Sequence, residues 1–387
     1  MKILHTSDWH LGHTLYGYDR REEQRAMLSQ IAEIVREERP DLLLVSGDVF
    51  DSAQPSSWAQ TLLYDALMKI HEASPGMTVV ITAGNHDSAT RHEVFRTPMQ
   101  TFGVHLIGLL SREAPATSDH IIEIPGKGYV VALPYAHERN IPEGFVQGLL
   151  DEVERRNREG LPVVLSAHTT VCGSDVTGHT DVRDGYVGGI EGIDVDRLGT
   201  GYDYLALGHI HHAQFVHTGR HNVRYSGTPI AVSFDESTDH TVSIVEIARH
   251  GAAPKVREVS IENPWPLVSL PATGAAPWTS VRDLFKNFPS DRQAYIRLNV
   301  EIEDFLPVGA NEEAYAISQG KACRYCLINP RRKKEATHTE KKLSVEEFKD
   351  LDPVDVARRF VEESGSEFEG DLEELFRIAL DSVNSTL

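Results

Sequence analysis

The stretch LLLVSGDVFD, residues 42–51, joins a run of apolar residues directly to a glycine and an aspartate. Such an uninterrupted apolar run is typical of a β-strand that is covered on both faces. Gly47 allows a sharp turn where the strand ends, and Asp48 presents a carboxylate at that point. The stretch therefore predicts a layered α/β or α+β domain that carries polar side chains at the edge where its strands end.

Five further segments have the same buried-strand pattern, at residues 3–6, 79–83, 130–134, 163–167 and 204–207. Amphipathic patterns predict helices between them, at residues 21–36, 58–71 and 145–158. After residue 207 the long helical patterns stop and short strands follow one another at 215–217, 223–225 and 242–247. We therefore expect hairpins and an antiparallel part of the sheet in that region.

Composition and charge limit the possible classes of protein. The chain has 387 residues, of which 40% are hydrophobic and 25% charged, and this usage excludes fibrous and wholly disordered proteins. Its 38 basic and 58 acidic residues give a formal charge of −20, which is the wrong sign for wrapping nucleic acid by bulk electrostatics. Only three cysteines occur, and neither a signal peptide nor a membrane span is apparent, so we expect a cytoplasmic protein.

The chain is predicted to have three parts. Residues 1–262 contain the pattern described above, and a Pro- and Gly-rich stretch at 263–277 marks a boundary. A small α+β capping domain is expected at 263–330, with helices near 281–287 and 312–318 and strands at 295–302 and 322–328. Residues 331–387 comprise a basic linker and an acidic tail with helical patterns at 354–363 and 372–383. Helices this short are expected to dock on another surface.

Candidate metal ligands follow five of the predicted strands. They are Asp8, His10, Asp48, Asn85, His168, His209 and His211. An aspartate or asparagine after a strand usually caps a turn, so the prediction depends on four motifs in fixed order, D-x-H, G-D, G-N-H-D and G-H-x-H. We assign Asp8, His10, Asp48 and His211 to one ion, and Asp48, Asn85, His168 and His209 to the other.

This mixture of imidazole and carboxylate suits manganese, iron or zinc better than magnesium. Two such ions activate a water for in-line displacement at phosphorus, so phosphoester hydrolysis is the expected reaction. His86 has no metal in this assignment and is the candidate to protonate the leaving oxygen. Asp87 is expected to fix its tautomer and to raise its pKa.

The first 235 or so residues resemble the calcineurin-like metallophosphoesterase superfamily and, more closely, its SbcD family, the nuclease subunit of the SbcC–SbcD DNA repair complex. The resemblance lies in KILHTSDWHLG (2–12), SGDVFDSAQPS (46–56), AGNHDS (83–88), ALGHIHHAQ (206–214) and YSGTPIAVSFDE (225–236). LSVEEF (343–348) also resembles the segment that follows the family's capping domain.

The resemblance implies a β-sandwich flanked by helices, with the metal assignment given above and His86 as catalytic acid. It implies an Mn-dependent exonuclease and endonuclease that acts on DNA ends and hairpins. It also implies a homodimer formed through helices beside the nuclease site, and a heterotetramer in which C-terminal helices bind the SMC-like ATPase SbcC. At Asp51 the chain departs from archaeal and eukaryotic relatives, which carry an assisting histidine there.

Two alternatives stay open. The motifs are equally compatible with a phosphodiesterase or phosphatase that acts on nucleotides or other small molecules, although such an enzyme does not need the segments after residue 263. The chain could also be a DNA-end tether without catalysis. The complete ligand set argues against the tether, and failure to bind two metals would support it.

Overall fold

The computed structural model describes residues 1–111, 119–177, 192–236 and 239–333, together with residues 354, 357, 358, 370, 373–377 and 380. The chain divides into two units, Met1–Arg332 and Lys333–Leu387. The predicted segment at 343–348 and most of the helical patterns at 354–363 and 372–383 lie outside the described residues. In the second unit, the guanidinium of Arg358 lies 3.3 Å from the carboxylate of Glu373.

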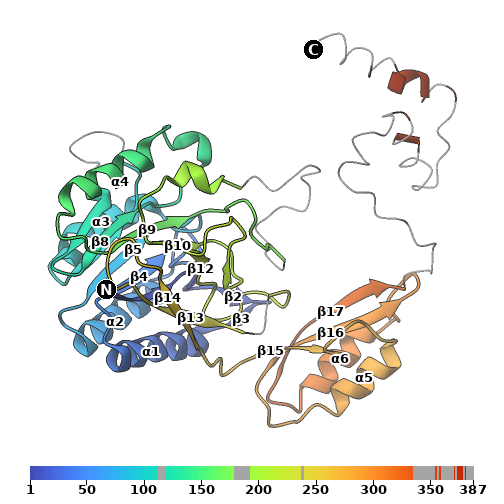
Figure 1. The fold of residues 1–387 in the computed structure, drawn as a ribbon. Coiled ribbons are helices and arrows are strands. Elements are labelled where there is room, and N and C mark those ends of the chain that lie inside the picture. Colours follow the sequence, from blue (N-terminus) through green and yellow to red (C-terminus); the bar gives the residue numbers. More distant parts are fainter. Residues whose placement is uncertain are drawn as a thin grey trace. The chain divides into compact units, whose positions relative to one another are not determined.

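The first unit contains two six-stranded sheets (Figure 1). One has the order β14 (Lys255–Ser260), β13 (Thr241–Glu246), β1 (Lys2–Thr6), β4 (Leu42–Ser46), β5 (Thr78–Thr82) and β6 (Val104–Ile107). The other has the order β11 (Gln214–Phe215), β12 (Val223–Tyr225), β10 (Tyr204–Gly208), β9 (Val163–His168), β8 (Gly128–Ala132) and β7 (Ile121–Ile124). Strands β1, β4, β5 and β6 are mutually parallel, as are β8, β9, β10 and β12.

The two sheets pack face to face and helices cover their outer faces. Ile3, Leu44, Val164 and Tyr204 belong to the inner core, which draws on both sheets. On the outside, α1 (Arg21–Glu38), α2 (Ser57–Ala73) and α3 (Ala89–Gln100) cover the first sheet, and α4 (Phe145–Arg156) covers the second. The expected α/β class, a β-sandwich flanked by helices, is confirmed.

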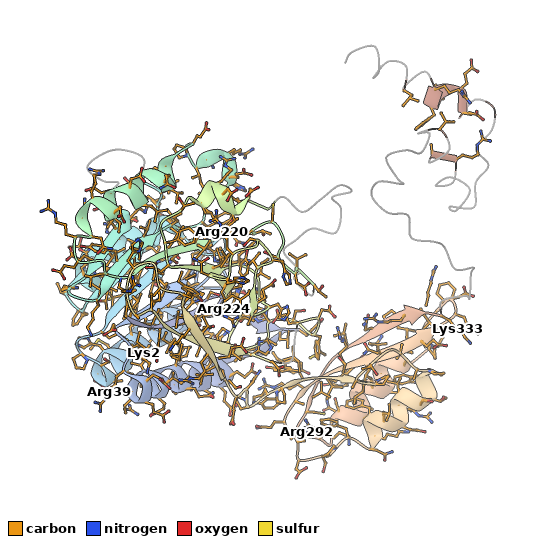
Figure 2. All side chains as sticks on the ribbon, in the orientation of Figure 1. Lys2, Arg39, Arg220, Arg224, Arg292 and Lys333 are labelled. Atoms are coloured by element: carbon orange, nitrogen blue, oxygen red, sulfur yellow. The ribbon has the colours of Figure 1, made fainter. Side chains whose placement is uncertain are left out.

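A buried arginine joins the two sheets. Arg224, labelled in Figure 2, extends from β12 to the other sheet, where its Nε donates to the Ser243 hydroxyl at 3.1 Å. Its Nη2 lies 2.5 Å from the carboxylate of Glu258 on β14. A buried cation needs such a partner, so the register of β14 against β13 matters for the packing of the sandwich.

The expectation of an antiparallel second half was only partly right. β12 is parallel to β10, because the chain crosses over before it pairs. β13 leaves that sheet altogether and pairs antiparallel with β1, and β14 follows it as a hairpin. α3, β6 and β7 were not predicted; α3 contains Pro98, and both strands have only four residues.

A small module follows the sandwich. It contains β15 (Leu267–Leu270), α5 (Trp278–Lys286), β16 (Tyr295–Ile302), α6 (Ala310–Ser318) and β17 (Arg324–Arg332). The strands form a parallel sheet in the order β15-β16-β17, and both helices pack against it around a core of their own. β15 lies within the stretch that was predicted to be a boundary loop. β17 pairs with β16 as far as Arg332, two residues into the segment that was expected to be a linker.

The remaining elements are short. They are β2 (Thr14–Leu15), β3 (Tyr18–Asp19) and the 3₁₀ helices Glu138–Asn140 and Val195–Leu198. Across the described residues, every helix is too short or too polar to cross a membrane.

Candidate metal centre

The predicted ligands meet at the ends of β1, β4 and β5 in one sheet and of β9 and β10 in the other. Parallel neighbours bring their carboxyl ends to one edge, and the two sheets lie face to face, so ligands of both reach one place. The ligand atoms form three clusters, each within 4.8 Å: Asp8, His10 and His211; His10, Asp48 and His86; Asp48, His168 and His209. Five separate chain segments thus supply a single site.

One half of the site is formed by Asp8, His10 and His211. The Nε2 atoms of the two histidines face each other at 3.2 Å, and their rings meet edge to face. Asp8 is fully buried, and its carboxylate oxygens accept from the backbone N–H of His209 at 3.1 and 3.2 Å. Two imidazole nitrogens and a carboxylate pointing at one place are a typical ligand set for a divalent cation.

The other half lies on the far side of Asp48. Its Oδ2 is 3.2 Å from Nε2 of His168 and 4.0 Å from Nε2 of His10, so this carboxylate lies between the two halves. The Oδ1 atom of Asn85 lies 3.0 Å from Nε2 of His168 and 2.9 Å from Nδ1 of His209. Asp48 therefore has the position that a bridging ligand requires.

The backbone at the site is held in an unfavourable conformation. Asp8, His10, Asp48 and His209 have φ angles of 53°, 44°, 51° and 97°, in the left-handed region that residues with a Cβ rarely adopt. Four of the six described non-glycine residues in this region thus belong to the candidate centre. Such strain persists only where the surrounding structure enforces it, and it concentrates at functional sites.

The charges of the site are strongly coupled. Burial alone would raise the pKa of Asp48, but the adjacent His168, His10 and His86 hold it far below its ordinary value. Burial would lower the pKa of His168, but the Asp48 carboxylate raises it to about 9. Burial would also lower the pKa of His211, but the hydrogen bond to Glu236 outweighs this effect and raises it. The cluster thus carries protons that a cation would displace.

A second layer of contacts orients the imidazoles. Nδ1 of His168 lies 2.8 Å from the carbonyl oxygen of Ser46, and Nδ1 of His211 lies 2.9 Å from Oε1 of Glu236. Nδ1 of His10 lies 3.5 Å from Oδ1 of Asp51. Each contact leaves Nε2 directed at the centre, as is usual for histidines that bind metals. Glu236 was not predicted as a functional residue, because nothing local in the sequence marks its contact with His211.

Asp51 takes part in this layer as well. Burial would raise its pKa, but the hydrogen bond from His10 and the nearby His13 and His86 lower it. Its backbone carbonyl oxygen lies 3.0 Å from Nδ1 of His86, and the His86 ring stands edge-on to that of His10. Asp51 therefore contacts the predicted acid through its main chain.

The predicted role of Asp87 was wrong. Its carboxylate does not orient His86; it accepts from the backbone N–H groups of Val49, Phe50 and Gly84, at 3.1, 2.9 and 2.9 Å. Three backbone donors are a better match for a buried carboxylate than one imidazole. Asp87 therefore ties the loop that carries Asp48 to the loop that carries Asn85 and His86.

The residues present fit a pair of divalent cations. Asp8 and Asp48 are 0% and 1% exposed, and within the described ranges neither forms an ion pair with lysine or arginine. A buried carboxylate without a cationic side chain is costly unless a metal or protonated imidazoles balance it. Asp8, His10, Asp48 and His211 would hold one ion, and Asp48, Asn85, His168 and His209 the other.

Comparison with known proteins agrees with this geometry. Residues 1–213 match the calcineurin-like phosphoesterase family, and residues 264–364 match the family described as type 5 capsule protein repressor C-terminal domain. The SbcD subunit of the SbcCD nuclease of Rhodobacter capsulatus is 38% identical over 72% of this chain and 73% of its own. Its counterpart in Bacillus subtilis is 31% identical over 79% of this chain and 80% of its own.

Among solved structures, TT1561 of Thermus thermophilus aligns with 67% of this chain and 99% of its own, at 12% identity and a TM-score of 0.41. The first match covers the sandwich as far as residue 213, which includes every strand end that supplies a candidate ligand, and the second covers the small module. The chain belongs to the SbcD family of the calcineurin-like metallophosphoesterases.

Proposed function

We propose that this chain is a metal-dependent nuclease that hydrolyses DNA phosphodiesters as the SbcD component of an SbcC–SbcD-type complex. The observation that carries the proposal is the convergence of buried carboxylates and imidazoles from both sheets on one centre. Membership of the SbcD family supports the choice of a nuclease over a phosphatase for small molecules. We propose Mn²⁺ as the cation, because the mixed imidazole and carboxylate ligands disfavour magnesium and the family resemblance implies manganese among the metals that remain.

The roles of the residues follow from their positions. A pair of divalent cations held there would supply a water of lowered pKa and would neutralise charge on the phosphate. Asp8 and Asp48 fix the centre, and His10, His168, His209, His211 and Asn85 complete it. His86 keeps a proton on Nδ1 toward the Asp51 carbonyl oxygen, and Nε2 then delivers a proton to the leaving oxygen.

We further propose the division into a nuclease domain (1–262), a capping domain (263–330) and a C-terminal segment (331–387) that binds the SMC-like ATPase SbcC. The separate core of the small module supports the first boundary, whereas β17 extends two residues past the second. The net charge of −20 disfavours bulk attraction of DNA ends and hairpins, so we expect local contacts or the partner to supply positive charge. The family resemblance implies a homodimer through helices beside the nuclease site, and we propose α2 and α3 for this contact, on which Met68 and Val94 are exposed.

We also place the protein in the cytoplasm, which its three free cysteines support. With a dimer of this chain, two ATPase subunits would complete a heterotetramer.

The decisive experiment is digestion of end-labelled linear and hairpin DNA with Mn²⁺, with and without the ATPase partner. We expect cleavage that requires Mn²⁺ and is lost in Asp48→Asn. Rapid hydrolysis of a chromogenic phosphodiester without DNA cleavage under any condition would favour the small-molecule enzyme. Failure to bind two Mn²⁺ would favour the tether.

A further inference from the structure

We propose that Arg297 of the small module is a positioning residue for His211, so that docking of the module sets the affinity of the half-site formed by Asp8, His10 and His211. The inference rests on the proposed function, because it concerns the same centre. It starts from a turn to which the metal assignment gives no role: Phe234, Asp235 and Glu236, called the 234–236 turn below.

Arg297 uses its whole guanidinium to join the module to this turn. Nη1 forms an ion pair with the carboxylate of Asp235, and Nη2 donates to the carbonyl oxygen of Phe234 at 3.1 Å. The guanidinium carbon lies 5.1 Å from the centre of the Phe234 ring, and Nε donates to Ser269 of β15 at 3.0 Å. The planar guanidinium is held by the module through Nε and binds the turn through both Nη atoms. It therefore fixes both the position and the orientation of the turn.

The next residue of the turn touches the metal centre. The Glu236 side chain is 3% exposed, and its Oε1 lies 2.9 Å from Nδ1 of His211. Its Oε2 accepts from the backbone N–H of Val232 at 3.1 Å, so the carboxylate cannot rotate freely. Since Asp235 and Glu236 are adjacent, a displacement of the first moves the second. Loss of a hydrogen-bond partner behind a metal-binding histidine weakens binding by roughly 10–100-fold.

A second link starts from the same strand, β16. Tyr295 is two residues before Arg297, and its hydroxyl donates to Glu23 of α1 at 2.5 Å. Gln24, the next residue, donates through Nε2 to the carbonyl oxygen of His10 at 3.1 Å and accepts from the Gly12 N–H at 3.0 Å. Strand β16 thus contacts Glu23 and Asp235, the residues next to the two supports Gln24 and Glu236. The Nε2 atoms of the two supported imidazoles lie 3.2 Å apart.

The alternative is that the contact between Arg297 and Asp235 only holds the module against the sandwich. In that case its loss would have little effect on metal affinity. Asp235 is 56% exposed, and such ion pairs add little stability. A positioning role has a different consequence. Its loss weakens metal binding at the half-site of Asp8, His10 and His211 and leaves the half-site of Asp48, His168 and His209 unchanged.

The test uses the full chain and measures Mn²⁺ binding by EPR of the free ion. We expect two Mn²⁺ for the wild type, and in Arg297→Gln one of them bound roughly 10–100-fold more weakly. Arg297→Lys should lie between, since it keeps the charge but loses the fork. Asp235→Asn removes the ion pair through an exposed side chain, so folding is not at risk. It should weaken the same site, but less than Arg297→Gln does, because Arg297 keeps its contacts with the Phe234 carbonyl oxygen and ring.

The matched control is Arg292→Ala in the same module. Arg292, labelled in Figure 2, stacks on Phe288 at 5.5 Å and should leave both affinities unchanged. In a double-mutant cycle, Arg297→Gln should cause no further loss of Mn²⁺ affinity once Glu236→Gln is present, because both act through the contact between Glu236 and His211. Folding of each variant is checked by its thermal unfolding.

Two equally tight Mn²⁺ sites in folded Arg297→Gln and Asp235→Asn would overturn the proposal. Equal weakening of both sites would overturn it too, since it would indicate general loosening. A wild type that binds two Mn²⁺ but cleaves no DNA would refute the proposed nuclease, and the isotherms would still decide the role of Arg297. A wild type that takes up no Mn²⁺ would refute both.

Discussion

Gly84 lies directly against the carboxylate of Asp48, and a Cβ atom at this glycine would stand 2.0 Å from Oδ1 and 2.3 Å from the Asp48 backbone nitrogen. No side chain fits in that space. The glycine of the G-N-H-D motif is therefore required by the neighbouring loop, which carries the carboxylate between the two halves of the centre.

We predict that Gly84→Ala displaces Asp48 and disrupts both half-sites. Because the obstructing atoms include backbone, the clash cannot be relieved by a rotamer change. We expect loss of tight binding of both Mn²⁺ ions and a fall of at least about 100-fold in DNA cleavage, as for loss of a major catalytic group. Mn²⁺ binding by EPR and a nuclease assay would measure these effects.

Gly148→Ala on α4 is the control, because nothing lies within 4 Å of its added Cβ. It should keep both ions and gain about 0.5–1 kcal/mol of stability from the lower entropy of its unfolded chain. Unchanged Mn²⁺ binding in Gly84→Ala would contradict the assignment of Asp48 as the shared ligand.

We predict that Asp87→Asn destabilises the fold by about 1–3 kcal/mol, because an amide cannot accept from Val49, Phe50 and Gly84 as a carboxylate does. Mn²⁺ affinity should fall as well, since the loops bearing Asp48 and Asn85 are no longer held together. Urea unfolding with and without Mn²⁺ would measure both changes. A variant of normal stability that only loses turnover would instead restore Asp87 to a role in proton transfer.

We predict the opposite pattern for His86→Ala. Both Mn²⁺ ions should stay bound, while turnover falls by about 10²–10⁴-fold, the usual contribution of a general acid. The assay compares cleavage of labelled DNA at saturating Mn²⁺ with the binding isotherm of the same preparation. Near wild-type cleavage would exclude His86 from the mechanism. The exposed His221, changed to alanine, is the control for an unrelated imidazole.

The sequence alone was sufficient to predict the strands that end at the centre, because each is a buried apolar run whose first ligand lies at its last residue or within three residues after it. β4 was predicted at its observed bounds, Leu42–Ser46, and the ends of β9 and β10 moved by only one residue. The structure brings all the predicted ligands together, although their metal-binding roles stay predictions. The motif spacing carried this information because parallel strands place their carboxyl ends at one edge.

Contacts between distant residues left no local signal. Glu236 is 25 residues from His211, and Asp235 is 62 residues from Arg297, so no periodicity connects them. The prediction for Asp87 failed for the opposite reason. Asp87 is adjacent to His86 in sequence, yet its carboxylate accepts hydrogen bonds from backbone groups of another loop. The return of β13 to the first sheet likewise depends on long-range pairing with β1.

The last prediction concerns His5, which is fully buried between the sheets. Its Nδ1 lies 3.0 Å from the Tyr204 hydroxyl and its Nε2 lies 3.2 Å from the Ser46 hydroxyl. Burial, with Arg224 nearby, lowers its pKa from 6.5 to about 3. Between pH 6.5 and about pH 3, His5 binds a proton in the unfolded chain but not in the folded chain. Stability is therefore retained above pH 6.5 and lost as the pH falls.

This group alone should remove up to about 1.4 kcal/mol of stability for each pH unit below 6.5, until about pH 3. His5→Gln cannot take up this proton and should flatten that dependence, although it is less stable at pH 7.5 because the contacts with Tyr204 and Ser46 are altered. Urea unfolding at pH 7.5, 6 and 5 would measure it, with exposed His217→Gln as control. An unchanged slope in His5→Gln would show that His5 is not kept neutral by the sandwich core.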